Sequence, residues 1–175
     1  MERREVDGVI EWRDGFGAEW TALTQPLANQ GAEMLGLIAY WAAWLEHAIS
    51  QSCMMMSDHP DVAEPLVSDV HRMKSSDIVN AMRKLVSRSA DPDDLALSVL
   101  EQATDALVAR NKMLHSVILG NDANGRSAVF HPRYPDAIDT VDQADLFAIA
   151  QRLFDACMSV MSIDWSRVGL AVSTR

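Results

Sequence analysis

Three residues whose side chains could act on a phosphodiester lie close together in the chain: Arg110, Asn111 and His115. Arginine carries a permanent charge on a planar group that matches phosphate geometry, and imidazole exchanges protons near neutral pH. RNA supplies its own nucleophile, the 2′-hydroxyl, so a protein can cleave it by moving two protons and stabilising the charge on phosphorus. We therefore predict that Arg110 stabilises the phosphorane oxygens, that His115 transfers protons and that Asn111 orients the imidazole or binds a phosphate.

The same residues interrupt an amphipathic helix. At about 100° per residue, an apolar stripe is formed by Ala96, Leu100, Ala103, Leu107, Leu114 and Ile118. Asn111 is expected inside this stripe, about 40° from its centre, with Arg110 at about 60° on one side and His115 at about 80° on the other. Polar groups buried without partners cost several kcal/mol. These side chains must therefore be paired or must border a solvent-filled cleft.

The run Arg110-Asn111-Lys112-Met113-Leu114-His115 resembles the Arg-polar-x-x-x-His motif of the HEPN superfamily (higher eukaryotes and prokaryotes nucleotide-binding domains). These domains are small helical bundles that carry the motif on their third long helix. The resemblance covers residues 30–162, of which six form the motif. It implies a homodimer that brings two copies of the motif together, often with metal-independent RNase activity. One copy supplies a single motif histidine, so a two-fold dimer would complete the acid–base pair.

Composition places the chain among globular proteins. It has 175 residues, of which 49% are hydrophobic and 23% are charged, enough for one domain with a substantial core. Cys53 and Cys157 have no metal-ligand spacing, so we expect them to be buried small side chains. No signal peptide is visible, and the most apolar stretch, residues 34–45, is too short to span a bilayer. We expect a cytoplasmic protein with no membrane contact, no metal site and no cofactor.

The net charge of −10 argues against a surface that coats nucleic acid broadly. Residues 1–70 carry a net charge of −9 and residues 134–175 carry −3, whereas residues 71–133 carry +2. The central part, which contains the motif, is therefore compatible with a local anion-binding cleft. Further candidates for RNA contact lie close to the motif or in the connection that follows it: Lys112, Arg126, His131 and Arg133.

Apolar periodicity predicts an all-α fold, a HEPN-like bundle of four main helices. The expected helices span residues 31–56, 75–89, 92 to between 115 and 119, and a fourth segment that opens at Thr140. Asp91 followed by Pro92 is a typical helix start, and Thr140 with Gln143 forms a capping-box pattern. Glu46 and His47 lie within the apolar run of the first helix, and we expect each to be paired or exposed rather than catalytic.

Two segments outside the four helices need separate predictions. Trp12, Phe16 and Trp20 are spaced by four, which favours a short N-terminal helix that packs on the bundle. Residues 120–139 are rich in turn-forming residues and form a loop, or a small hairpin with arms at 117–119 and 127–131. The expected organisation is an N-terminal extension (1–29), a HEPN-like helical domain (30–165) and a tail (166–175).

No Gly-rich phosphate loop, serine-nucleophile motif, His-Glu-x-x-His or Cys-x-x-Cys is present in the sequence. The function that the HEPN resemblance implies is therefore left without a competing motif: a metal-independent endoribonuclease, with a composite Arg/His site at a homodimer interface and single-stranded RNA as substrate. The alternative is a non-catalytic HEPN-like dimeric module that binds a nucleotide or a partner protein, for example an antitoxin in a toxin–antitoxin pair. The acidity of the chain favours the alternative, and the polar second position, Asn111, favours the nuclease.

Overall fold

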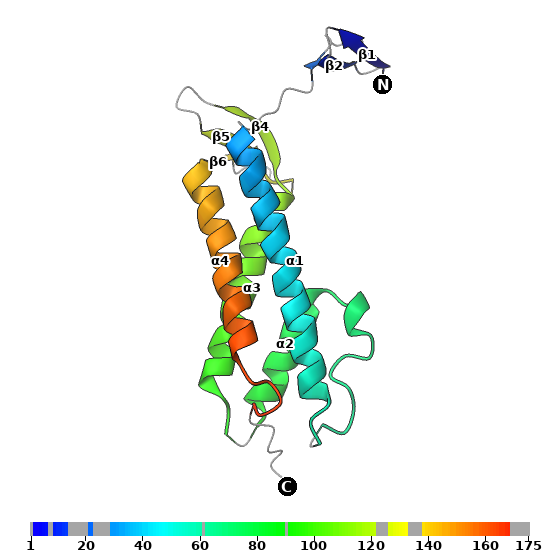
Figure 1. Ribbon diagram of the computed structural model, residues 1–175, viewed down its shortest axis with the longest axis vertical. Coiled ribbons are helices and arrows are strands. Elements are labelled where there is room, and N and C mark those ends of the chain that lie inside the picture. The colour runs from blue at the N-terminus through cyan, green and yellow to red at the C-terminus, as the bar shows by residue number, and fades with distance from the viewer. Residues whose placement is uncertain are drawn as a thin grey trace.

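The computed structural model describes residues 2–6, 9–13, 21–22, 29–60, 62–89, 91–121, 126–132 and 138–168. These residues are mostly helical, as predicted (Figure 1). The helices are α1 (Asn29–Ser57), η1 (Val70–Arg72), α2 (Ser75–Ser87), α3 (Asp94–Leu114) and α4 (Gln143–Ser162). The strands are β1 (Glu2–Val6), β2 (Val9–Arg13), β3 (Thr21–Ala22), β4 (Val117–Asn121), β5 (Ser127–Phe130) and β6 (Ile138–Val141). None of the helices in these ranges is long and apolar enough to cross a membrane.

The bundle is built on α1, which packs against α2, α3 and α4. In Figure 1, α1 and α4 lie side by side and run in the same direction, while α3 runs in the opposite direction. Helix-spaced apolar side chains fill the space between them; those with no exposed surface include Ile38, Leu45, Ile49, Leu100, Leu153 and Val160. Cys53 and Cys157 are buried and free in this core, as predicted, and burial raises the pKa of both thiols.

The buried face of α3 is rotated from its predicted position. Its fully buried residues are Ala96, Val99, Leu100, Ala103, Ala106, Leu107 and Met113. Leu114 is 40% exposed, and Ile118 has left the helix for β4, so both were wrongly placed in the stripe. Arg110 continues the buried face three residues after Leu107, whereas Asn111 is exposed. The expected positions of Arg110 and Asn111 are therefore exchanged, because the neighbouring helices cover the side of α3 that bears Arg110.

Two predicted helix starts are displaced by two residues. Asp93, not Asp91, caps α3, and its Oδ1 accepts a hydrogen bond from the Ala96 backbone N–H at 2.9 Å. The capping box of α4 is formed by Asp142 and Asp145, not by Thr140 and Gln143. Thr140 cannot start the helix because it belongs to β6, whose extended backbone pairs with β5.

The connection between α3 and α4 forms a three-stranded antiparallel sheet in the order β4-β5-β6. The two predicted hairpin arms correspond to β4 and β5, and the third strand, β6, was not predicted. Val117 pairs with Phe130 at the end of the hairpin next to α3. β4 begins three residues after the last residue of α3, so the sheet is anchored directly beside the motif.

The predicted short N-terminal helix is wrong where the structure describes this segment. β1 and β2 pair in antiparallel register, with Val6 opposite Val9, and β3 pairs with β2. The sequence between Val6 and Val9 is Asp-Gly, the dipeptide favoured in two-residue hairpin turns. This local turn signal, together with the strand-favouring Val, Ile and Trp of β2, outweighs the spacing of the aromatic residues. The packing of this segment on the bundle stays a prediction.

The packed part of the chain continues beyond α4. Trp165 is 1% exposed, and its Nε1 donates a hydrogen bond to the Val160 carbonyl at 2.8 Å. Val168, which the sequence assigned to the tail, is also buried. These residues close the end of the bundle that lies away from the β4-β5-β6 sheet (Figure 1).

Candidate functional site

A cleft of about 1030 Å³ lies where the C-terminal part of α3 meets α1, the start of α2 and the end of β5. We call it the motif cleft. Its lining residues are Glu46, Met73, Lys74, Ser75, Ser76, Leu107, Val108, Arg110, Asn111, Lys112, His115, Ser116, Val129, His131 and Pro132. All three residues of the predicted catalytic set are among them. The volume is just above the range of roughly 300–1,000 Å³ that is typical of small-molecule sites.

The charge of the motif cleft differs from that of the chain. Among the lining residues that the structure describes, three are basic (Lys74, Arg110 and Lys112) and one is acidic (Glu46). The whole chain carries −10. A local excess of positive charge in an acidic protein favours binding of an anion at this one place rather than over a broad surface.

Arg110 enters the motif cleft from the buried face of α3, and its side chain is only 17% exposed. Its Nη2 donates to Glu46 Oε1 of α1, and its Nη1 donates to Asn111 Oδ1 at 2.9 Å. Nε is buried and has no hydrogen-bond partner among the described residues. Each Nη group carries two N–H donors. One donor on each therefore remains for an oxyanion after these two bonds are made.

Asn111 and Glu46 thus hold the guanidinium from two directions. Asn111 is exposed and acts on its neighbour Arg110, rather than lying within the buried face as predicted. Glu46 meets the expectation that it is paired, and His47 is exposed. Glu46 was not among the predicted site residues, although a carboxylate within the apolar run of α1 was a signal that it needs a cationic partner.

His115 stands at the C-terminal end of α3. Its backbone N–H donates to the Asn111 carbonyl at 3.2 Å, and its φ and ψ of −98° and 6° end the helix. The side chain is exposed and lines the motif cleft. The next residue, Ser116, donates its hydroxyl to the Lys112 carbonyl, which closes the last turn. His115 is therefore held by a local helix end while its imidazole stays accessible to a ligand.

The four candidates for RNA contact are placed differently. Lys112 and His131 line the motif cleft. Arg126 does not: its guanidinium lies 3.6 Å from Asp145 Oδ2 and 4.0 Å from Asp142 Oδ2, at the start of α4. Arg133 lies outside the described residues. The start of α2 also contributes Lys74, Ser75 and Ser76, which the sequence indicated only as a helix start.

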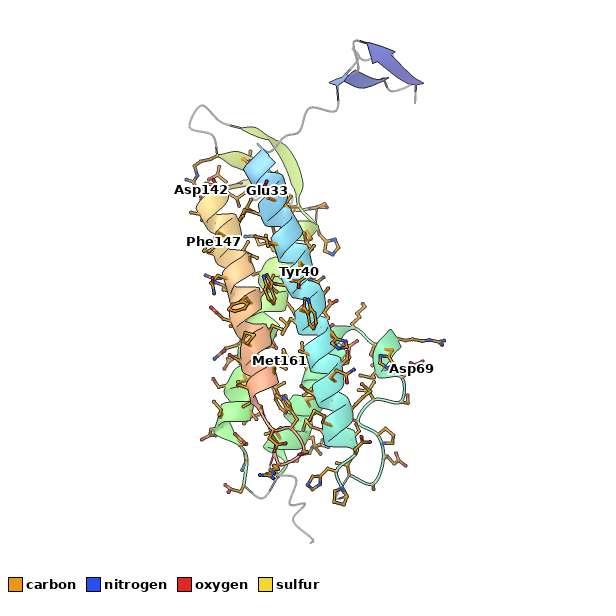
Figure 2. The ribbon with its side chains drawn as sticks, viewed as in Figure 1. Glu33, Tyr40, Asp69, Asp142, Phe147 and Met161 are labelled. Atoms are coloured by element: carbon orange, nitrogen blue, oxygen red, sulfur yellow. The ribbon has the colours of Figure 1, made fainter. Side chains whose placement is uncertain are left out.

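A second surface feature lies on α1 and α4. Figure 2 shows Tyr40 on α1 and Phe147 and Met161 on α4, and their exposed fractions are 52%, 54% and 60%. Trp44 is 44% exposed, and the centroids of the Tyr40 and Trp44 rings are 6.4 Å apart. Trp44 and Glu46 are two residues apart, so their side chains are separated by about 200° around the helix axis. This apolar face therefore points away from the motif cleft.

No family model, no curated protein and no solved structure matches the chain. Within the described ranges, no group of three or more His, Cys, Asp or Glu side chains is placed to hold a metal ion. A functional assignment consequently depends on the chemistry of the motif cleft.

Proposed function

We propose that the protein is a metal-independent endoribonuclease of HEPN type that binds single-stranded RNA in the motif cleft. The observation that carries this proposal is that Arg110 and His115 line one cleft whose described lining residues carry a net positive charge, although the chain is acidic. Arg110 stabilises the negative charge that develops on the phosphorus oxygens, with the N–H donors left by Glu46 and Asn111. His115 takes part in proton transfer at the 2′-oxygen or the 5′-oxygen.

The oligomeric state belongs to the proposal as well. The HEPN resemblance implies a homodimer in which two copies of the Arg110–His115 motif approach each other. His115 is exposed at the end of α3, so it is accessible to a second copy as well as to RNA. Sedimentation analysis of the purified chain is expected to give a dimer at micromolar concentration.

The test is cleavage of a mixed-sequence single-stranded RNA by the purified protein in excess EDTA, with His115→Ala and Arg110→Ala beside it. Wild type is expected to cut and to leave 2′,3′-cyclic phosphate ends, while both variants lose activity by at least about 100-fold. A useful matched variant is His47→Ala, because His47 is exposed on α1 and does not line the motif cleft. Cleavage that survives in both motif variants contradicts the proposal.

The alternative function is a non-catalytic HEPN-like module that binds a nucleotide or a partner protein. The exposed Tyr40, Trp44, Phe147 and Met161 favour it, because apolar patches of this kind are typical of protein-binding surfaces. A folded protein that never cuts RNA, and whose Arg110→Ala and His115→Ala variants lose dimerisation or thermal stability, supports this alternative. An antitoxin is one partner that such a module would bind.

A further inference from the structure

The pairing of β4 with β5 brings His131 to the end of α3, where His115 lies. Val117 of β4 is opposite Phe130 of β5 in an antiparallel register. Extending this register by one residue sets His131 opposite Ser116, the residue that follows His115. Opposite residues of antiparallel strands have Cα atoms about 4.5–5.5 Å apart. The sheet therefore brings two histidines that are sixteen positions apart in the chain to the same end of the hairpin.

Both imidazoles also line the motif cleft, together with Arg110. His115 is exposed and His131 is half-buried, so their surroundings differ. RNA cleavage through the 2′-hydroxyl needs one group that accepts a proton and another that donates one. Two histidines that line the same cleft as Arg110 can meet this requirement within one chain.

We infer that His131 is a second catalytic residue, which completes the acid–base pair with His115 in the cleft of a single chain. This inference rests on the proposed ribonuclease function. In this inference, His131 of the same chain takes the place of the second copy of His115, which the HEPN resemblance assigned to the acid–base pair. A dimer then serves RNA binding or stability and supplies no proton-transfer group.

The reaction balances with these two groups. One imidazole accepts the proton of the 2′-hydroxyl as the 2′-oxygen attacks phosphorus. The P–O5′ bond breaks, and the protonated second imidazole gives its proton to the departing 5′-oxygen. The products are a 2′,3′-cyclic phosphate and a 5′-hydroxyl, and the two histidines have exchanged protonation states. Arg110 stabilises the extra negative charge on the phosphorus oxygens between these steps.

The first experiment measures kcat for wild type, His131→Asn and His131→Gln on a mixed-sequence single-stranded RNA. Asn and Gln can each replace hydrogen bonds of imidazole but transfer no proton, so the fold is kept and the chemistry is lost. We expect kcat to fall by at least about 100-fold in both variants. The matched control is His71→Asn, because His71 is exposed on η1 and does not line the motif cleft. Circular dichroism and Tm verify that each variant is folded.

The second experiment uses an RNA whose scissile 5′-oxygen is replaced by sulfur, because a thiolate leaves without being protonated. The variant that lacks the proton donor, either His131→Asn or His115→Ala, is expected to recover to within about tenfold of wild type. The other variant stays inactive. If neither variant recovers, His131 binds substrate instead of transferring a proton, and the inference is overturned.

The third experiment asks whether the two histidines act in the same chain. His115→Ala and His131→Asn chains with different tags are mixed and allowed to exchange subunits. We expect no restored activity, because every cleft still lacks one imidazole. Restoration to about a quarter of the wild-type rate would show that the pair is shared between copies, because about half of the dimers are then mixed and each mixed dimer forms one intact site of two.

These outcomes separate the inference from the function on which it rests. If wild type and His131→Asn cut RNA equally, the assignment of His131 is wrong and the ribonuclease proposal stands. If wild type does not cut at all, both are wrong.

Discussion

Glu46 of α1 accepts a hydrogen bond from Nη2 of Arg110 on α3, and both side chains line the motif cleft. The two residues are 64 positions apart in the chain, so the contact joins the first and third helices of the bundle. Arg110 is 17% exposed and Glu46 is 42% exposed, so solvent screens the pair on its Glu46 side. Its contribution to stability is therefore modest, about 1 kcal/mol or less. Its larger effect is on the orientation of the guanidinium.

Replacing Glu46 tests this orientation. In Glu46→Leu the guanidinium loses one of its two fixed partners, and we expect kcat for RNA cleavage to fall roughly 10- to 100-fold with KM changed less than about threefold. Glu46→Gln keeps an oxygen acceptor and is expected to lie between wild type and Glu46→Leu. Glu33→Gln is the matched control, because Glu33 is exposed near the N-terminal end of α1 (Figure 2). Equal rates for Glu46→Leu and Glu33→Gln would rule out a positioning effect.

Arg110→Lys separates the charge of Arg110 from the shape of its side chain. Lysine keeps the positive charge but cannot hold Glu46, Asn111 and an oxyanion in one plane. We expect kcat to fall by at least about 30-fold while Tm falls by only a few degrees, because the ion pair is partly solvated. The measurement is a set of cleavage rates paired with thermal unfolding by circular dichroism.

The control for Arg110→Lys is Arg83→Lys. Arg83 of α2 also anchors to α3, where its Nη2 donates to Thr104 Oγ1 at 3.0 Å, but it does not line the motif cleft. Arg83→Lys should change Tm by a similar amount and leave cleavage unchanged. A parallel loss of activity in both variants would indicate that packing of α3, and not the chemistry of Arg110, controls the rate.

The helices and the motif could be predicted from local patterns. Apolar spacing predicts the four main helices because each of them contributes apolar side chains to the shared core. The position of Arg110 on the buried face of α3 could not be predicted in this way. Which side of α3 is covered depends on how α1, α2 and α4 surround it, and that arrangement is a tertiary property.

The motif cleft was predicted only in part for the same reason. Arg110, Asn111 and His115 are close in sequence, so a local motif identifies them. Glu46 and His131 reach the cleft through helix packing and strand register, which join residues far apart in the chain. The Asp7-Gly8 dipeptide was a local signal for a hairpin turn that the prediction, which depended on aromatic spacing, did not use.

Trp165 tests whether the chain after α4 belongs to the bundle. Trp165→Phe keeps a large apolar ring but removes the N–H that donates to the Val160 carbonyl. That carbonyl is then left without this donor in a buried environment, so we expect the free energy of unfolding to fall by about 1–2 kcal/mol. Urea unfolding measures the difference. Arg167→Ala is the control, because Arg167 is exposed, and a loss as large in this variant would argue against a specific role for the indole.

The capping box of α4 gives a stability change with a defined pH dependence. Hydrogen bonds from the backbone N–H groups of Asp145 and Ala144, with the nearby charge of Arg126, lower the pKa of Asp142 below its ordinary value of 3.8. A carboxylate with a lowered pKa in the folded state stabilises the fold above its ordinary pKa. This stabilisation is lost as the pH falls through the lower, folded-state value.

Asp142→Ala should therefore be less stable than wild type at pH 7, with a Tm lower by about 3–6 °C because α4 loses its N-cap. The difference should shrink as the pH is lowered from about 5 to about 2.5, because the wild-type carboxylate becomes protonated and accepts less well. Thermal unfolding across this range measures it. Asp155→Ala is the control, since Asp155 is exposed on the same helix and caps nothing. A Tm difference for Asp142→Ala that is constant across the range would show that the charge of the cap does not contribute.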